Sequence, residues 1–238
     1  MCGIVLLWDE QSPRIARARI AAAMGEAIRH RGPDGHGLWT SPDAPLCLAH
    51  RRLAIQGLGE QGAQPMLHPA GKGALIYNGE LFGATELRAS LARLGVTFRG
   101  SSDTEILLHA LGLWGIEKTL ARVSGQFAFA WFDSATKRLY LARDRVGIRP
   151  LYYATDNGRL AAGSEQKALL LLPWVDRRPR IDALLRYLVL GRTDDVPGET
   201  MLEGIRALPA GHWAAWDGKA LTLHRYYRAE TDVPASTV

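Results

Sequence analysis

The feature that most constrains the fold is an alternation of side chains in the segment FAFAWFD, residues 127–133. Phe127, Phe129 and Trp131 alternate there with two alanines and a further phenylalanine. A period of two residues places successive side chains on opposite faces of a β-strand. The segment therefore predicts a strand, within a β-rich region that extends over residues 125–163.

Asp156, Asn157 and Gly158 add a hairpin signal, because Asn-Gly suits the tight turn between two antiparallel strands. Other strands are expected at residues 2–8, 45–55 and 73–82. Helices are expected at residues 13–30 (capped by Ser12), 86–94, 103 to about 113, 166–172 and 181–190, with a loop over 29–37. Strands in two sheets with helices in blocks favour a layered α+β fold, and 238 residues suffice for one large domain or two small ones.

The composition is that of a globular protein and argues against several functions. The formal net charge is +5, but the basic residues are dispersed, which argues against nucleic-acid binding as the main function. No apolar run approaches the ~20 residues that span a membrane, and the chain start lacks the basic segment of a signal peptide. With two cysteines and no CxxC or Cys/His pattern, the sequence predicts a cytoplasmic protein with free thiols, no metal and no cofactor.

Cys2 is the first candidate for chemistry. Removal of Met1 would leave a cysteine that carries its own α-amine. A free thiol has a pKa of ~8.5 and an α-amine has a pKa of ~7.7–8.0. Such a residue therefore combines a nucleophile and a base without a histidine partner. The alternative is a small buried residue of the first strand, since cysteine is often buried.

A series of short motifs, in order along the chain, favours the chemical interpretation. They are MCGI at the start, RHRGPDG (29–35), AHRRLAI (49–55), GAQPM (62–66), YNGE (77–80), SSDTE (101–105), RDRVGIRPLYY (143–153), SEQKAL (164–169) and GETMLEGIRALPAGH (198–212). In this ordered set the chain resembles the N-terminal glutaminase domain of glutamine-dependent asparagine synthetases, a branch of the N-terminal-nucleophile amidotransferases. The resemblance covers residues 1–228 and leaves 229–238 as a flexible tail or the start of a linker. It implies a four-layer αββα sandwich with the nucleophile at the end of a sheet strand.

The resemblance implies that Cys2 attacks the side-chain amide of glutamine to form a thioester, which water then hydrolyses. Asn78 and Gly79 would form the oxyanion hole, since an amide NH2 and a glycine N–H can both approach a developing negative oxygen. The alternative for Asn78 and Gly79 is a type I′ hairpin turn.

Arg52 would clamp the α-carboxylate of glutamine with paired hydrogen bonds. Its neighbour Arg51 points to the opposite face if both lie in a strand. Asp103 and Glu80 would recognise the α-ammonium group. The alternatives are a solvated arginine at position 52 and a simple helix cap at Asp103.

The other motif residues are expected to support the structure around this pocket. His30, Arg31 and Asp34 belong to a supporting loop, and Arg143, Asp144 and Arg145 to a framework in which they pair with one another. His50 is expected to be a hydrogen-bonded core histidine, and Cys47 a buried, inert thiol. In LFGA, Gly83 stands where the family usually has Asn, which leaves the oxyanion pair unaffected.

The sequence contains no SGG-x-DS loop, which the family uses for pyrophosphate binding in its ATP-dependent domain. We therefore expect a separate ATP-dependent synthetase subunit or domain to receive the ammonia. Two alternatives stay open: a stand-alone hydrolase of γ-glutamyl amides, and a non-catalytic interaction module that has kept the fold.

Overall fold

The structure is a computed structural model that describes residues 1–54, 62–192 and 196–229. The strands are β1 Gly3–Asp9, β2 Gly35–Thr40, β3 Leu46–Arg52, β4 Met66–Leu67, β5 Gly73–Phe82, β6 Ser124–Asp133, β7 Arg138–Arg143, β8 Tyr152–Asp156, β9 Arg159–Gly163, β10 Arg206–Ala207, β11 His212–Trp216 and β12 Leu221–Arg225. The helices are α1 Arg14–Ala27, α2 Ala84–Arg93, α3 Asp103–Leu120, α4 Gln166–Leu169 and α5 Ile181–Leu190, with a 3₁₀ turn η1 at Arg29–Arg31.

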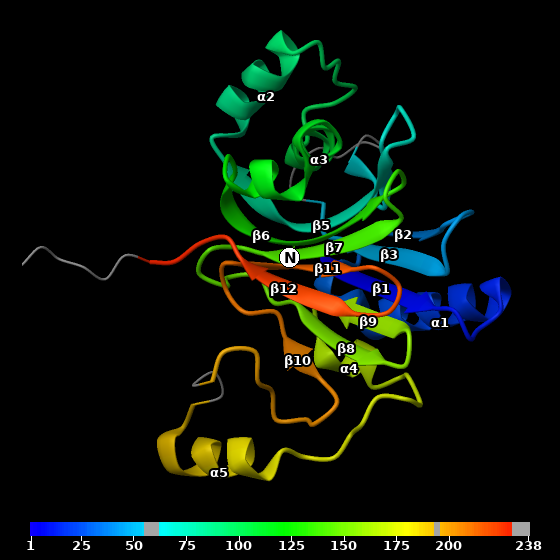
Figure 1. The fold of residues 1–238 in the computed structure, drawn as a ribbon, viewed down its shortest axis with the longest axis vertical. Coiled ribbons are helices and arrows are strands. Elements are labelled where there is room, and N and C mark those ends of the chain that lie inside the picture. Colours follow the sequence, from blue (N-terminus) through cyan, green and yellow to red (C-terminus); the bar gives the residue numbers. More distant parts are fainter. Residues whose placement is uncertain (55–61, 193–195, 230–238) are drawn as a thin grey trace, which may run out of the picture.

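Two six-stranded antiparallel sheets form the two inner layers. Their strand orders are β10-β8-β9-β1-β3-β2 and β12-β11-β7-β6-β5-β4. Helices α1 and α4 cover the outer face of the first sheet, and α2 and α3 lie over the outer face of the second (Figure 1). The predicted αββα sandwich is therefore confirmed.

Strand β6 shows how the sequence pattern produces these layers. Its alanines, Ala128 and Ala130, face the first sheet in the central core, together with Ile4 and Leu6 of β1. Its large side chains, among them Phe129, pack instead with α3 on the outer face. Small residues allow the two sheets to approach, while aromatic residues fill the wider space under the helix.

The Asn157–Gly158 hairpin is confirmed, because it joins β8 to β9 with φ values of 41° and 77°. Helix α1 differs from the expectation: the hydroxyl of Ser12 donates to Asp9 Oδ2 over 2.5 Å and does not cap the helix. The helix ends at Ala27, before η1. Helix α3 continues to Leu120 across a break at Gly115.

Strand β2 was missed, since residues 29–37 were expected to be loop. Gly35 and Gly37 suggest a turn when they are read locally. In the fold they pair with β3, and a Cβ at Gly37 would lie 2.0 Å from the carbonyl oxygen of Gln64. Glycine at position 37 thus reflects a close backbone approach within a strand.

Of the remaining expectations, residues 53–54 lie outside β3, while residue 55, part of the loop after it and the tail 230–238 fall outside the described residues. Within the described part of the chain, no helix combines the length and the apolar character needed to cross a bilayer.

Candidate active site

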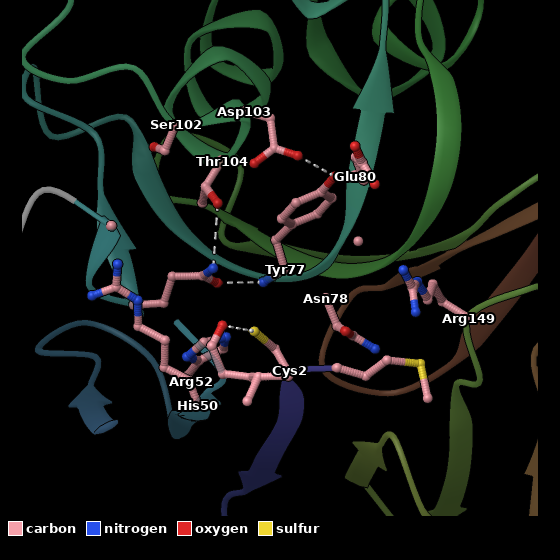
Figure 2. Close-up of a pocket in the computed structure, with 15 residues that line it drawn as sticks. Cys2, His50, Arg52, Tyr77, Asn78, Glu80, Ser102, Asp103, Thr104 and Arg149 are labelled. Carbon is pink, nitrogen blue, oxygen red and sulfur yellow. Dashed lines mark hydrogen bonds between the residues drawn. The ribbon is translucent and has the colours of Figure 1, made fainter. Parts of the chain in front are cut away.

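A cavity of ≈ 160 Å³ lies where the start of β1, the end of β3, the middle of β5 and the first turn of α3 meet. All six predicted site residues line it: Cys2, Arg52, Asn78, Gly79, Glu80 and Asp103. Figure 2 shows Cys2 on one side of this cavity and Asp103 on the other. Residues from distant parts of the sequence are therefore brought together by the pairing of strands within each sheet and the packing of the two sheets.

Cys2 directly precedes β1 and is partly buried. Its thiol lies 3.8 Å from the backbone carbonyl of Leu53, to which it can donate a weak hydrogen bond. Met1 also lines the cavity. While Met1 is attached, the nitrogen of Cys2 is an amide, which cannot act as a base.

Asn78 and Gly79 lie within β5, opposite Ala128 and Phe127 of β6. The hairpin-turn alternative for this Asn-Gly pair is therefore wrong. Asn78 is 2% exposed, and its Nδ2 has no hydrogen-bond partner among the described residues. A buried donor without a partner costs free energy, so this amide is a strong candidate for binding a ligand oxygen.

Gly79 is required by the sheet itself. A Cβ at this position would lie 2.2 Å from the carbonyl oxygen of Gln126, on the neighbouring strand. No larger residue fits here without displacing β6, so β5 keeps its close approach to β6 beside the cavity.

Asp103 is held against β5. Its Oδ2 accepts a hydrogen bond from the hydroxyl of Tyr77 over 2.9 Å and from the backbone N–H of Leu81 over 3.1 Å. Ser102, not Asp103, caps α3, because Ser102 Oγ accepts from the backbone N–H of Glu105. The helix-cap alternative for Asp103 is therefore wrong. Burial raises the pKa of Asp103, despite these hydrogen bonds, which lower it.

The two adjacent arginines point in different directions. Arg52 ends β3 and lines the cavity. Arg51 turns toward α1, where its Nε donates to the carbonyl oxygen of Gly25 over 3.1 Å and its guanidinium pairs with Glu26. Of these two adjacent arginines, Arg52 lines the cavity and Arg51 does not, and strand geometry accounts for their opposite directions.

His50 and Cys47 are buried, as expected. His50 is 2% exposed, its Nε2 has no hydrogen-bond partner among the described residues, and burial lowers its pKa to about 4. This histidine is therefore neutral at pH 7, although it lines the cavity. Burial raises the pKa of the Cys47 thiol, which keeps it in its inert form.

Among the lining residues that were not predicted are Gln64, Thr104 and Arg149. Gln64 links β5 to α3. Its Oε1 accepts a hydrogen bond from the backbone N–H of Tyr77 in β5 over 2.6 Å, and its Nε2 donates to Oγ1 of Thr104 in α3 over 3.3 Å. Gln64 lies in the GAQPM motif, and that motif could have identified it as a residue of the site. Arg149 lies in RDRVGIRPLYY, and its buried Nε has no hydrogen-bond partner among the described residues.

The expected mutual pairing of Arg143, Asp144 and Arg145 is wrong. Within the described residues no ion pair joins them; Asp144, which is fully buried, accepts hydrogen bonds from backbone N–H groups, including that of Arg149 over 2.9 Å. Arg143 donates to backbone carbonyls, including that of Arg149 over 2.8 Å. Both side chains therefore fix the loop that presents Arg149 to the cavity.

Comparisons with known proteins agree with this geometry. The chain is 32% identical over 234 residues to asparagine synthetase (glutamine-hydrolyzing) 3 of Bacillus subtilis, covering 98% of this chain and 37% of the relative. It is 35% identical over 173 residues to asparagine synthetase (glutamine-hydrolyzing) 1 of the same organism, covering 72% and 27%. The chain thus spans roughly a third of the length of these relatives.

Among solved structures, glutamine phosphoribosylpyrophosphate amidotransferase from B. subtilis superposes with a TM-score of 0.70 at 21% identity, covering 95% of this chain and 49% of that one. This likeness shows that the two chains share a fold. The family model described as "Glutamine amidotransferase domain" matches residues 1–227. The chain therefore belongs to the glutamine amidotransferase domain family.

Proposed function

We propose that this chain hydrolyses the side-chain amide of glutamine and supplies the ammonia to an ATP-dependent synthetase. One observation carries the proposal: the thiol of Cys2 and the unpartnered amide of Asn78 line the same small cavity. The cavity also holds the cation Arg52 and the anion Asp103, which match the two charges of an amino acid.

In the proposed reaction, removal of Met1 first frees the α-amine of Cys2. The amine accepts the thiol proton, and Sγ attacks the amide carbon of glutamine. The tetrahedral oxyanion accepts hydrogen bonds from Asn78 Nδ2 and the backbone N–H of Gly79. When the intermediate collapses, the amine returns the proton to the leaving nitrogen, which departs as ammonia. Water then adds to the thioester, and Cys2 leaves as a thiol with glutamate as the product.

Charge recognition explains why an amino acid would be preferred over a simple amide. The guanidinium of Arg52 would bind the α-carboxylate, and Asp103 with Glu80 would bind the α-ammonium group. Because burial raises the pKa of Asp103, a bound ammonium group compensates a carboxylate that is costly to ionise. Substrate binding is thus expected to favour the ionised form of Asp103.

The ammonia acceptor is proposed from the relatives. Both are named glutamine-hydrolyzing asparagine synthetases and are much longer than this chain. We take residues 1–228 as the glutaminase unit, residues 229–238 as a tail or linker, and a synthetase subunit or domain as the partner. A cytoplasmic location stays a prediction.

Glutamine hydrolysis by the purified, Met1-free chain tests the proposal, with Cys2→Ala as the control. Mass spectrometry after treatment with a glutamine-like electrophile should find a single adduct on Cys2. Turnover that survives in Cys2→Ala would refute the assignment of the nucleophile. A Met1-free chain with neither turnover nor adduct would identify a non-catalytic module.

A further inference from the structure

Two motifs of the sequence, RHRGPDG and SEQKAL, take no part in the reaction above, yet the fold brings them together beside Cys2. Arg31 lies in η1, and Glu165 directly precedes α4. Arg31 Nη1 lies 3.0 Å from Glu165 Oε1. From the same guanidinium, Nε donates to the backbone carbonyl of Cys2 over 3.1 Å.

This contact matters because Cys2 lies beyond the end of the β-ladder. The pairing of β1 with β3 begins at Gly3, and the pairing with β9 begins at Val5. The carbonyl of Cys2 is therefore held by a side chain. Ser164, the first residue of SEQKAL, secures the adjoining chain: its Oγ accepts from the N–H of Ile4 over 3.0 Å, and its own N–H donates to the carbonyl of Ile4 over 2.9 Å.

The ion pair behind this contact is partly shielded from water. The side chains of Arg31 and Glu165 are 9% and 24% exposed. Glu165 also contacts His30 Nε2 at 2.7 Å and Lys167 Nζ at 3.3 Å. Burial alone would raise the pKa of Glu165, but the hydrogen bonds from Arg31, His30 and Lys167 bring it below its ordinary value. The Glu165 carboxylate is thus ionised at neutral pH and fixes the guanidinium of Arg31 through their ion pair.

We propose that Arg31 and Glu165 are positioning residues for the nucleophile: by fixing the backbone carbonyl of Cys2, they set where its thiol and its liberated amine stand relative to Asn78. This inference rests on the proposed function. In a self-contained nucleophile and base, a rotation of one residue displaces both groups at once. Displacements of about 1 Å in a catalytic geometry can cost roughly 10²-fold in rate.

The variants Arg31→Met and Glu165→Gln test the proposal, with Arg29→Met as the matched control. Arg29 lies in the same turn η1, but its side chain is 68% exposed and its ion pair is with Glu26. We expect Arg31→Met to lower kcat by roughly 10- to 100-fold, with KM within about 3-fold of wild type, since other elements bind the substrate. Glu165→Gln keeps a hydrogen-bond acceptor and should lose roughly 3- to 10-fold in kcat, while Arg29→Met should stay within about 2-fold.

Arg31→Lys separates geometry from charge. A lysine keeps the positive charge but cannot donate in two fixed directions as a guanidinium does. Its kcat should therefore stay well below that of wild type. Full rescue by Arg31→Lys would show that charge alone matters and would overturn the positioning role.

Two further measurements separate positioning from folding and processing. Mass spectrometry confirms that Met1 is removed in every variant, and titration of active sites with the electrophile normalises kcat to folded molecules. If Arg31→Met retains wild-type kcat per active site, or changes only KM, the inference is wrong. If Arg31→Met does not fold, kcat per active site and KM of Glu165→Gln test the inference in the same way.

Alkylation of Cys2 by iodoacetamide gives a readout that needs no glutamine. Its rate should change at least about 3-fold in Arg31→Met and stay unchanged in Arg29→Met, because Arg31 donates to the Cys2 carbonyl whereas the side chain of Arg29 pairs with Glu26. An inactive wild-type chain with this alkylation difference would refute the proposed function and keep the positioning role. Equal alkylation rates in an active wild-type background would refute the positioning role.

Discussion

The two Asn-Gly pairs of this chain allow a sharp test of the oxyanion hole. Asn78 lies within β5 with a buried, unpartnered Nδ2, whereas Asn157 occupies a hairpin turn at φ 41°. The same substitution, Asn→Ala, should therefore have opposite consequences at the two positions. At Asn78 it should remove catalysis and leave the fold intact, and at Asn157 it should weaken the fold and leave catalysis intact.

The expected magnitudes follow from these environments. An unsatisfied buried donor costs about 1–3 kcal/mol, so its removal in Asn78→Ala offsets much of the packing that is lost. The free energy of unfolding should change by no more than about 1 kcal/mol, while the loss of one oxyanion donor typically lowers kcat by roughly 10²- to 10³-fold. Asn157→Ala replaces asparagine, whose short polar side chain tolerates the left-handed region, with alanine, which does not; this should cost up to about 1 kcal/mol, with kcat unchanged.

Urea denaturation measures stability, and glutamate release per titrated active site measures kcat. If Asn78→Ala keeps more than about a third of wild-type kcat, its amide is not an oxyanion donor, since such donors contribute far more. A loss of several kcal/mol of stability in Asn78→Ala, with kcat per active site unchanged, would instead show a purely structural role.

Three other outcomes are expected. An N-terminal extension that resists removal should abolish turnover, because the base becomes an amide; intact-mass analysis paired with the glutaminase assay checks this, and an active extended chain would contradict the self-contained base. Burial lowers the pKa of His50 to about 4, so the folded state binds fewer protons than the unfolded state between pH 6.5 and 4. The free energy of unfolding should therefore fall as the pH falls through that window, with a loss of roughly 2 kcal/mol from this residue at pH 5 relative to neutral pH. In His50→Gln this pH dependence should be weaker, which urea denaturation at neutral pH and at about pH 5 would show. Gly37→Ala should lower both stability and activity, by more than about 1 kcal/mol in unfolding free energy, since its Cβ would meet the Gln64 carbonyl at 2.0 Å; an unchanged melting temperature would contradict that close approach.

Much of the candidate site could be predicted from sequence because its residues sit in short motifs with distinctive chemistry. Cys2 at the chain start, Arg52 in HRRL and Asp103 in SSDTE were selected by such patterns, and the structure places all three around one cavity. Gln64 and Arg149 were missed. Their part in the cavity depends on contacts with Tyr77 and Asp144, which no local pattern shows.

The sequence alone determined which residues alternate along β6 and where the Asn157–Gly158 turn falls, and it made Cys2 the first candidate for the nucleophile. Only the tertiary structure decided that the other Asn-Gly pair lies within a strand and that Gly35 and Gly37 belong to β2. It also decided that Arg31 reaches Cys2. The physical reason is that periodicity and turn chemistry act over a few neighbouring residues. The conformation of an Asn-Gly pair or a glycine-rich segment depends instead on whether a distant strand is present to pair with it.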